Sequence, residues 1–433
     1  MARTELMVAV FALLSAAPLV AQQREVSLPD ALRLAELVQP AVIQARANVM
    51  TADARLRTTR AAYLPNLSIS SSGSKSATDG AARIDPITGE VLPGGSSTTS
   101  LSSGVNASVD LFTGFRRGAD IGAARATTEA ASASLSNARF QQRLNTTNAF
   151  FDALAARQLL AVREASVRRA QEQLKISVSK LAAGSATRSD SLRSRVTLGT
   201  AQLQLLNAQT TLATSEANLA RNIGVTGRVR AAEDSALYHL SADVDSAALR
   251  AEAYEKSPSV QAALASSRAA AASLRASRSG YWPTLALSAG TSFNGSNRTD
   301  YHLFNQRQVS LQLSWTLFNR FSREQQIATQ QANLDIAAAN AADIGRGIET
   351  TLTGQLASLQ AARAGIDIAQ TSVAAATEDL RVVQERYRLG AATIVDVLTS
   401  QESLNQAEID AVNARFGYLR ARAQIEALLG RSL

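Results

Sequence analysis

Few side chains in this 433-residue sequence could do acid–base, nucleophilic or metal chemistry at neutral pH. The chain has no cysteine and only two histidines, His239 and His302. Without cysteine there can be no disulfide, thiolate metal site or cysteine nucleophile. Two histidines leave almost nothing for zinc or a proton shuttle, and no serine has a histidine partner at a plausible site. We therefore expect no catalytic residues, no cofactor, no metal and no enzyme activity.

Two aspartates stand out by their spacing. Asp190 and Asp396 each lie three residues after a threonine, which is the Ser/Thr-x-x-Asp pattern of a capping box at the start of a helix. A glycine six residues before each aspartate, Gly184 or Gly390, is expected to end the preceding helix in a left-handed conformation. Capping fully explains Asp190. Asp396 can cap its helix in the same way.

These motifs occur twice because the chain is internally duplicated. Residues 63–67 (YLPNL) reappear as 281–285 (YWPTL), an offset of 218, whereas Gly184, Asp190 and Gly224 recur at an offset of 206. The first repeat therefore carries twelve extra residues, all between Pro65 and Phe112. A segment that tolerates such an insertion is expected to be an exposed loop.

The duplication divides the chain into a first repeat, residues 22–224, and a second repeat, residues 245–433, joined by a linker at 225–244. Residues 1–21 precede them and read as a secretory signal peptide: Arg3, then an apolar run, then small residues up to Ala21. The net charge of +8 comes from arginines scattered among acids, so we expect no nucleic-acid partner.

Each repeat has one segment in which apolar and polar residues alternate with a period of two. These segments predict β-hairpins at 65–112 and 283–318, with strands of roughly ten residues and outer loops at 75–100 and 295–306. One face of each strand is apolar and the other is rich in Ser and Gln. Such strands fit either a half-buried sheet in a soluble domain or a membrane barrel with water inside.

Elsewhere the hydrophobic period is helical, with seven-residue rows typical of coiled coils. One row runs through Leu352, Leu359, Ile366, Val373, Leu380 and Tyr387. Long helices are predicted at 116–183 and 322–389, each about 100 Å long. Helices half as long are predicted at 29–62, 188–223, 246–280 and 394–429. Two of these short helices, stacked end to end, would match the length of one long helix.

Four strands cannot close a barrel, and open strand edges are not tolerated in lipid. If the strands lie in a membrane, three chains would supply twelve strands, a usual number for a barrel. Aromatic residues gather where strand meets helix, as in a membrane-interface belt: Tyr63, Phe112, Phe115, Tyr281, Trp282, Phe318 and Phe321. The alternative is a non-channel structural coiled-coil protein of the periplasm, with a small soluble sheet.

From Leu28 to Gly430 the sequence resembles the TolC-like outer-membrane efflux protein family, most specifically over residues 387–398 (YRLGAATIVDVL). The resemblance implies a mainly α fold with a membrane β-barrel: a homotrimer with a 12-stranded barrel in outer-membrane lipid and a periplasmic α-barrel of long coiled-coil helices. It also implies a passive exit duct for a tripartite efflux pump, with a periplasmic adaptor protein and an inner-membrane transporter as partners. Type I protein secretion is the alternative within the family.

The resemblance further implies a gate at the periplasmic tip. Asp396 aligns with an aspartate that forms a ring at the constriction, and Tyr387 and Asp190 align with a pair that helps to hold the closed state. Ala392 and Thr399 stand where the best-known members have an arginine and a second aspartate, which implies a weaker lock. The tips expected to contact the adaptor are Gly184, Gly390, Ala183 and Ala391.

Overall fold

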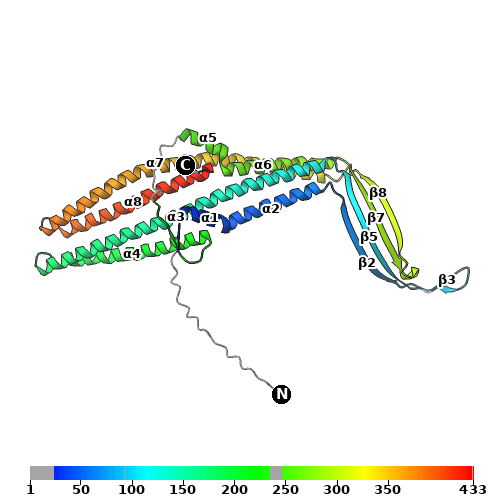
Figure 1. Cartoon of the computed structure of the whole chain (residues 1–433), viewed down its shortest axis with the longest axis horizontal. Coiled ribbons are helices and arrows are strands. Elements are labelled where there is room, and N and C mark those ends of the chain that lie inside the picture. Colours follow the sequence, from blue (N-terminus) through cyan, green and yellow to red (C-terminus); the bar gives the residue numbers. More distant parts are fainter. Residues whose placement is uncertain (1–23, 93, 235–245, 432) are drawn as a thin grey trace, which may run out of the picture.

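The chain forms a long helical body with a β-sheet at one end (Figure 1). At the other end, called the tip, the chain reverses direction twice, each time between two antiparallel helices. The computed structural model describes residues 24–92, 94–234, 246–431 and 433. The predicted signal peptide, residues 1–21, and residues 235–244 of the predicted linker lie outside the described residues. Among the described residues, no helix is both long enough and apolar enough to cross a bilayer.

Two helices of 67 residues run along the body, α3 (Arg116–Ala182) and α7 (Ser322–Arg388). Each turns back at the tip into a helix of 36 residues, α4 (Arg188–Ile223) or α8 (Ile394–Leu429). The bounds predicted for α4 and α8 are confirmed, and each long helix ends one residue before its predicted end. The seven-residue rows and the internal duplication together therefore located these four helices well.

The prediction of unbroken helices at 29–62 and 246–280 is wrong. Each region contains two helices, α1 (Leu28–Val38) with α2 (Pro40–Ala61), and α5 (Ser246–Lys256) with α6 (Pro258–Ser277), followed by the 3₁₀ turn η2 (Arg278–Tyr281). The break falls before a proline in both repeats, because proline has no backbone N–H to donate and so suits the first position of a new helix.

The sheet has four antiparallel strands in the order β2 (Asn66–Thr78), β5 (Ser96–Phe112), β7 (Thr284–Ser296) and β8 (Phe304–Ser314). The two predicted hairpins are present, but their strands have 11 to 17 residues, and the outer loops are correspondingly shorter than predicted. Pairing of β5 with β7 joins the two repeats in one sheet, which leaves β2 and β8 as its edges.

Two small pairs of strands have no counterpart among the predicted elements. In the outer loop of the first repeat, β3 (Arg83–Ile84) pairs with β4 (Val91–Leu92). Beside the helical body, β1 (Arg24–Val26) pairs in parallel with β6 (Val229–Ala231), so the segment predicted as a linker, residues 225–244, contains a strand. Strands of two or three residues are too short for a hydrophobic period to reveal them.

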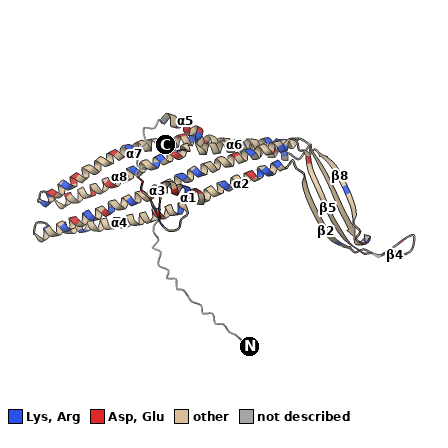
Figure 2. Ribbon diagram, viewed as in Figure 1, with Lys and Arg blue, Asp and Glu red and all other residues tan. Residues whose placement is uncertain are grey.

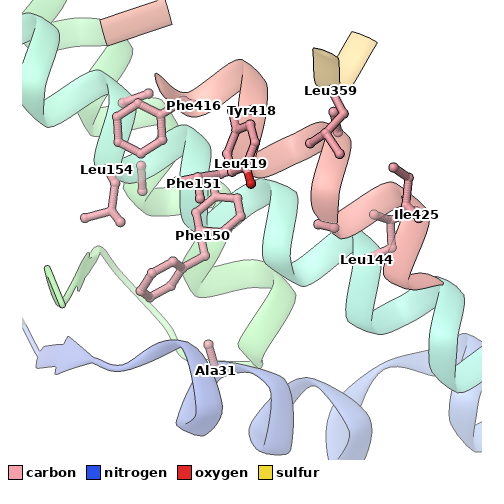
Figure 3. Close-up of a cluster of buried hydrophobic side chains, with 14 of the residues drawn as sticks. Ala31, Leu144, Phe150, Phe151, Leu154, Leu359, Phe416, Tyr418, Leu419 and Ile425 are labelled. Atoms are coloured by element: carbon pink, nitrogen blue, oxygen red, sulfur yellow. The ribbon is translucent and has the colours of Figure 1, made fainter. Parts of the chain in front are cut away.

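The main hydrophobic core lies midway along the helical body and is formed mainly by α1, α3, α4, α7 and α8. Phe150 and Phe416 are fully buried there. In Figure 3 Phe151 lies between α3 and α8, near Leu419, whereas Phe150 points toward Ala31 of α1. The rings of Phe150 and Phe151 lie 6.2 Å apart in an edge arrangement. Because α3 and α8 belong to different repeats, this core fastens the two repeats together.

Candidate functional site

At the tip of the helical body, both predicted capping boxes are formed. The backbone N–H groups of Thr187 and Thr393 donate to the side chains of Asp190 and Asp396, at 3.0 and 2.8 Å. The hydrogen bonds from Thr393 to Asp396 lower the pKa of that carboxyl below its usual value of 3.8, with the backbone N–H as the largest cause. Asp396 is therefore ionised at neutral pH.

The two tip turns depend on glycine for their backbone conformation. Gly184 and Gly390 have φ values of 72° and 80°, as predicted for left-handed helix ends. The following residues close the turns, because Ser185 N donates to Lys180 O and Ala391 N donates to Arg386 O, both at 2.8 Å. A Cβ added at either glycine would meet nothing within 4 Å. The positive φ thus favours glycine at both positions, and the surface around each glycine is open.

Tyr387 connects the two repeats near the tip. Its side chain is 5% exposed and packs with Leu380, Ile394 and Val397. The Lys180 Nζ atom lies 4.5 Å from the centre of the Tyr387 ring and donates to the Tyr387 carbonyl oxygen at 2.5 Å. The structure therefore brings Lys180 of α3 against Tyr387 of α7, a cation–π contact that the sequence analysis did not anticipate.

No hydrogen bond joins Tyr387 to Asp190 within the described part of the chain. The Asp190 carboxylate accepts from Thr187 N in its own cap, and the Tyr387 hydroxyl is buried without a hydrogen-bond partner among the described residues. Tyr387 and Asp190, the expected gating pair, thus both lie at the tip but do not bond to each other. Asp190 caps α4, and Tyr387 packs in the apolar cluster beside Lys180.

Further along the body, an ion pair links α3 to α8. Arg169 donates through Nη1 and Nη2 to both carboxylate oxygens of Glu408, at 3.1 and 2.6 Å, and Nη2 also donates to Asn405 Oδ1 at 2.6 Å. The side chains of Arg169 and Glu408 are only about one-fifth exposed, 21% and 22%. A bidentate ion pair that is largely buried fixes the relative position of its two helices better than an exposed pair does. The sequence carries no local signal for it, since the partners are 239 residues apart.

At the opposite end, where strands meet helices, the predicted aromatic residues form edge-to-face pairs. The ring centroids are 5.4 Å apart for Phe112 and Phe115, and 5.6 Å apart for Phe115 and Trp282. Phe318 and Phe321 repeat the arrangement in the second repeat at 5.5 Å. Phe115 and Phe321 start the long helices in a left-handed conformation, with φ values of 65° and 61°.

An arginine covers a tyrosine at the same junction in both repeats. The guanidinium carbon of Arg117 lies 5.0 Å from the centre of the Tyr63 ring, and that of Arg323 lies 3.9 Å from the centre of the Tyr281 ring. Arg323 also donates to the backbone oxygen of Gly280. These contacts hold the start of each long helix against the chain that enters the sheet.

The two faces of the sheet differ in chemistry. The hollowed face holds a cavity of about 320 Å³ lined mainly by Ser, Gly, Asn and Gln, among them Ser70, Gly104, Asn106, Ser288 and Gln308. The opposite face carries Leu67, Ile69, Val309, Leu311 and Leu313, all more than 60% exposed. Charged residues are dense on the helices and nearly missing from the four strands (Figure 2). Water therefore suits the hollow side and a hydrocarbon environment suits the other.

The sequence matches the family described as outer membrane efflux protein over residues 31–225 and 249–431, which is most of the chain. The chain belongs to this family and is an outer-membrane protein, so the resemblance noted in the sequence is confirmed.

Among its relatives, the outer membrane efflux protein BepC of Brucella suis is 25% identical over 333 residues, which cover 75% of this chain and 72% of BepC. The outer membrane protein TolC of Escherichia coli K12 is also 25% identical, over 299 residues that cover 66% of this chain and 61% of TolC. This chain thus spans less than two thirds of TolC in that alignment.

The fold is shared with solved outer-membrane channels. The CmeC outer membrane channel of Campylobacter jejuni superposes with a TM-score of 0.79 at 18% identity, over 93% of this chain and 85% of CmeC. At this identity the likeness defines the fold, and the roles of individual residues must be argued from this chain.

Proposed function

We propose that three copies of this chain form an exit duct across the outer membrane for a tripartite efflux pump. The observation that carries the proposal is the four-stranded sheet, with open edges at β2 and β8, an exposed apolar face and a hollowed polar face. Three such sheets joined edge to edge would give a closed twelve-stranded barrel with no unpaired backbone in lipid. The aromatic residues at the strand–helix junction would then lie at the periplasmic surface of the membrane.

In this assembly the helices continue the barrel into the periplasm as a tube. Passage through the duct is passive, and the energy for transport comes from an inner-membrane transporter. A periplasmic adaptor protein would contact the turns around Gly184 and Gly390. The open space around these glycines supports this role, because a partner helix can approach the backbone closely there.

The tip would act as a gate. Asp396 of the three copies would form an anionic ring where the tube narrows, while Tyr387 and Asp190 take part in the closed state. Opening requires α7 and α8 to move relative to α3 and α4, so the contacts of Lys180 with Tyr387 and of Arg169 with Glu408 would have to break or slide.

The test of the assembly is the native mass of the protein extracted from membranes in mild detergent, with bound detergent subtracted. We expect three times the mass of one chain. A well-folded monomer would overturn the duct proposal, because four strands from one chain cannot close a barrel.

The test of the tip uses two substitutions at Gly390. Gly390→Trp adds bulk to the proposed adaptor surface, whereas Gly390→Ala adds only the strain of a left-handed alanine, about 1–2 kcal/mol. We expect Trp to abolish efflux of a pump substrate while trimers still insert, and Ala to retain most efflux. An equal loss of efflux for both variants would show that efflux depends on the conformation of the turn, and it would contradict the proposed adaptor surface.

A further inference from the structure

Two basic residues lie on the apolar face of the sheet. Lys75 on β2 and Arg307 on β8 are the only Lys or Arg residues in the four strands of this sheet. Because side chains alternate along a strand, Lys75 is on the same face as Leu67 and Ile69, and Arg307 is on the same face as Val309. Both side chains are exposed, and neither makes a hydrogen bond or ion pair within the described part of the chain.

These two cations occupy equivalent places on the two edge strands. Lys75 lies three residues from Thr78, the outer end of β2, and Arg307 lies three residues from Phe304, the outer end of β8. The outer ends are those farthest from the helical body (Figure 1). In the trimeric duct, on which this inference rests, β8 of one copy pairs with β2 of the next, so each joint between copies brings the two cations to the same edge.

The register of that joint is narrowly restricted by strand length. β8 has 11 residues and β2 has 13, and the apolar faces of both must point the same way. If every residue of β8 is paired, Phe304 lies opposite either Thr78 or Ser76. In the first register Arg307 lies directly opposite Lys75. In the second register it lies opposite Gly73, and Lys75 is its diagonal neighbour, about 7–8 Å away.

Like charges placed opposite each other across a strand pair are destabilising, and a cation on the lipid face is tolerated only near the membrane surface. An anion bound at the joint would reduce both the repulsion between the two cations and the cost of placing them on the lipid face. The acidic residues closest in sequence, Asp79 and Asp300, lie beyond the strand ends, and no ion pair links either of them to Lys75 or Arg307 among the described residues. Guanidinium and ammonium groups together match the geometry and charge of a phosphate.

We infer that each joint between copies holds the phosphate of an outer-leaflet lipid headgroup between Lys75 of one copy and Arg307 of the next. The acyl chains of that lipid lie along the apolar band formed by Ile69, Val309 and Leu311, which are 79%, 75% and 63% exposed. The lipid then neutralises the joint and covers the seam between two edge strands.

Native mass spectrometry of the detergent-extracted protein tests this inference and the oligomeric state in one spectrum. The probe is diphosphorylated lipid A, compared with the same lipid after removal of its phosphates. We expect phosphorylated lipid to bind to the trimer up to one molecule per joint, and dephosphorylated lipid to bind far less. The double variant Lys75→Gln/Arg307→Gln should bind at least about tenfold more weakly, because it removes charge-assisted hydrogen bonds.

Arg298→Gln is the matched control, since it removes an exposed arginine from the turn between β7 and β8 without touching the joint. It should bind lipid like the unsubstituted protein. Equal lipid binding by the double variant would overturn the inference while trimers persist. So would charge-dependent binding of inorganic phosphate without the lipid, since the site would then serve a soluble anion. A monomeric mass would instead overturn the duct proposal itself.

Discussion

The middle of the helical body and the sheet contain similar apolar side chains in opposite surroundings. Phe150 and Phe416 are fully buried within one chain, whereas Val309 and Ile69 remain 75% and 79% exposed. The helical body completes its own core by bringing α3 against α8. No described element of the chain covers the apolar face of the sheet, and in the proposed duct lipid would cover it. One chain can therefore stabilise the first region, whereas the second depends on its environment.

The largest effect is expected in the core of the helical body. Phe416→Ala should lower the free energy of unfolding by about 3–5 kcal/mol, because it leaves a cavity where a fully buried ring stood. Chemical denaturation of the detergent-solubilised protein measures the change. Phe321→Ala is the matched control, since that ring is 69% exposed, and it should cost less than about 1 kcal/mol. Similar losses of stability at both positions would contradict the claim that the helical body, unlike the sheet end, completes its own core.

The next largest effect is the difference in membrane insertion between a charge placed on the apolar face of the sheet and one placed on the hollowed face. Leu311→Arg places a charge on the apolar face and should disfavour insertion by about 2–4 kcal/mol. Gln308→Arg, on the hollowed face, should insert nearly as well as the unsubstituted protein. The measurement is the fraction of protein recovered as inserted trimer after refolding into vesicles. If Gln308→Arg were the more damaging variant, the proposed orientation of the sheet would be inverted.

A smaller effect compares the two repeats where strand meets helix. Gly114 has a φ of 62°, and a Cβ there would lie 2.4 Å from the Cβ of Trp282. Gly114→Ala should therefore destabilise the protein by about 1–3 kcal/mol. Arg320 is the equivalent residue of the second repeat and already carries a side chain at a φ of 56°. Arg320→Ala should change the midpoint of thermal unfolding little, and a larger shift for it than for Gly114→Ala would contradict this account.

The smallest effect is a pH dependence of the start of α8 at the tip. Since the folded state lowers the pKa of Asp396 below 3.8, the cap is fully stabilising above that pH and weakens as the pH falls through the lowered pKa. Hydrogen exchange of the peptide that begins α8, corrected for intrinsic rates, should show loss of protection below about pH 4. Asp396→Asn should remove the dependence. Protection that increases on acidification would contradict the sign.

The sequence predicted features that depend on local patterns. The bounds of α4 and α8, the two left-handed glycines and both capping boxes follow from hydrophobic period and residue type. The contact of Lys180 with Tyr387 and the ion pair of Arg169 with Glu408 could not be predicted, because each joins residues more than 200 positions apart. Helix breaks before Pro40 and Pro258 were available from the sequence, because proline favours the first position of a helix, yet the two regions were predicted as unbroken helices.

The pairing of β5 with β7 has a consequence for the order of folding. Each hairpin can close on its own, since only 17 residues separate β2 from β5 and 7 residues separate β7 from β8. In contrast, α3, α4, α5 and α6 all lie in the chain between β5 and β7. Closing so long a loop costs conformational entropy. The extensive contact of α3 with α6 can offset this cost before β5 and β7 pair. We therefore expect the complete sheet to form late, after the helices have brought its two halves together, so that its apolar face is assembled only in the last step.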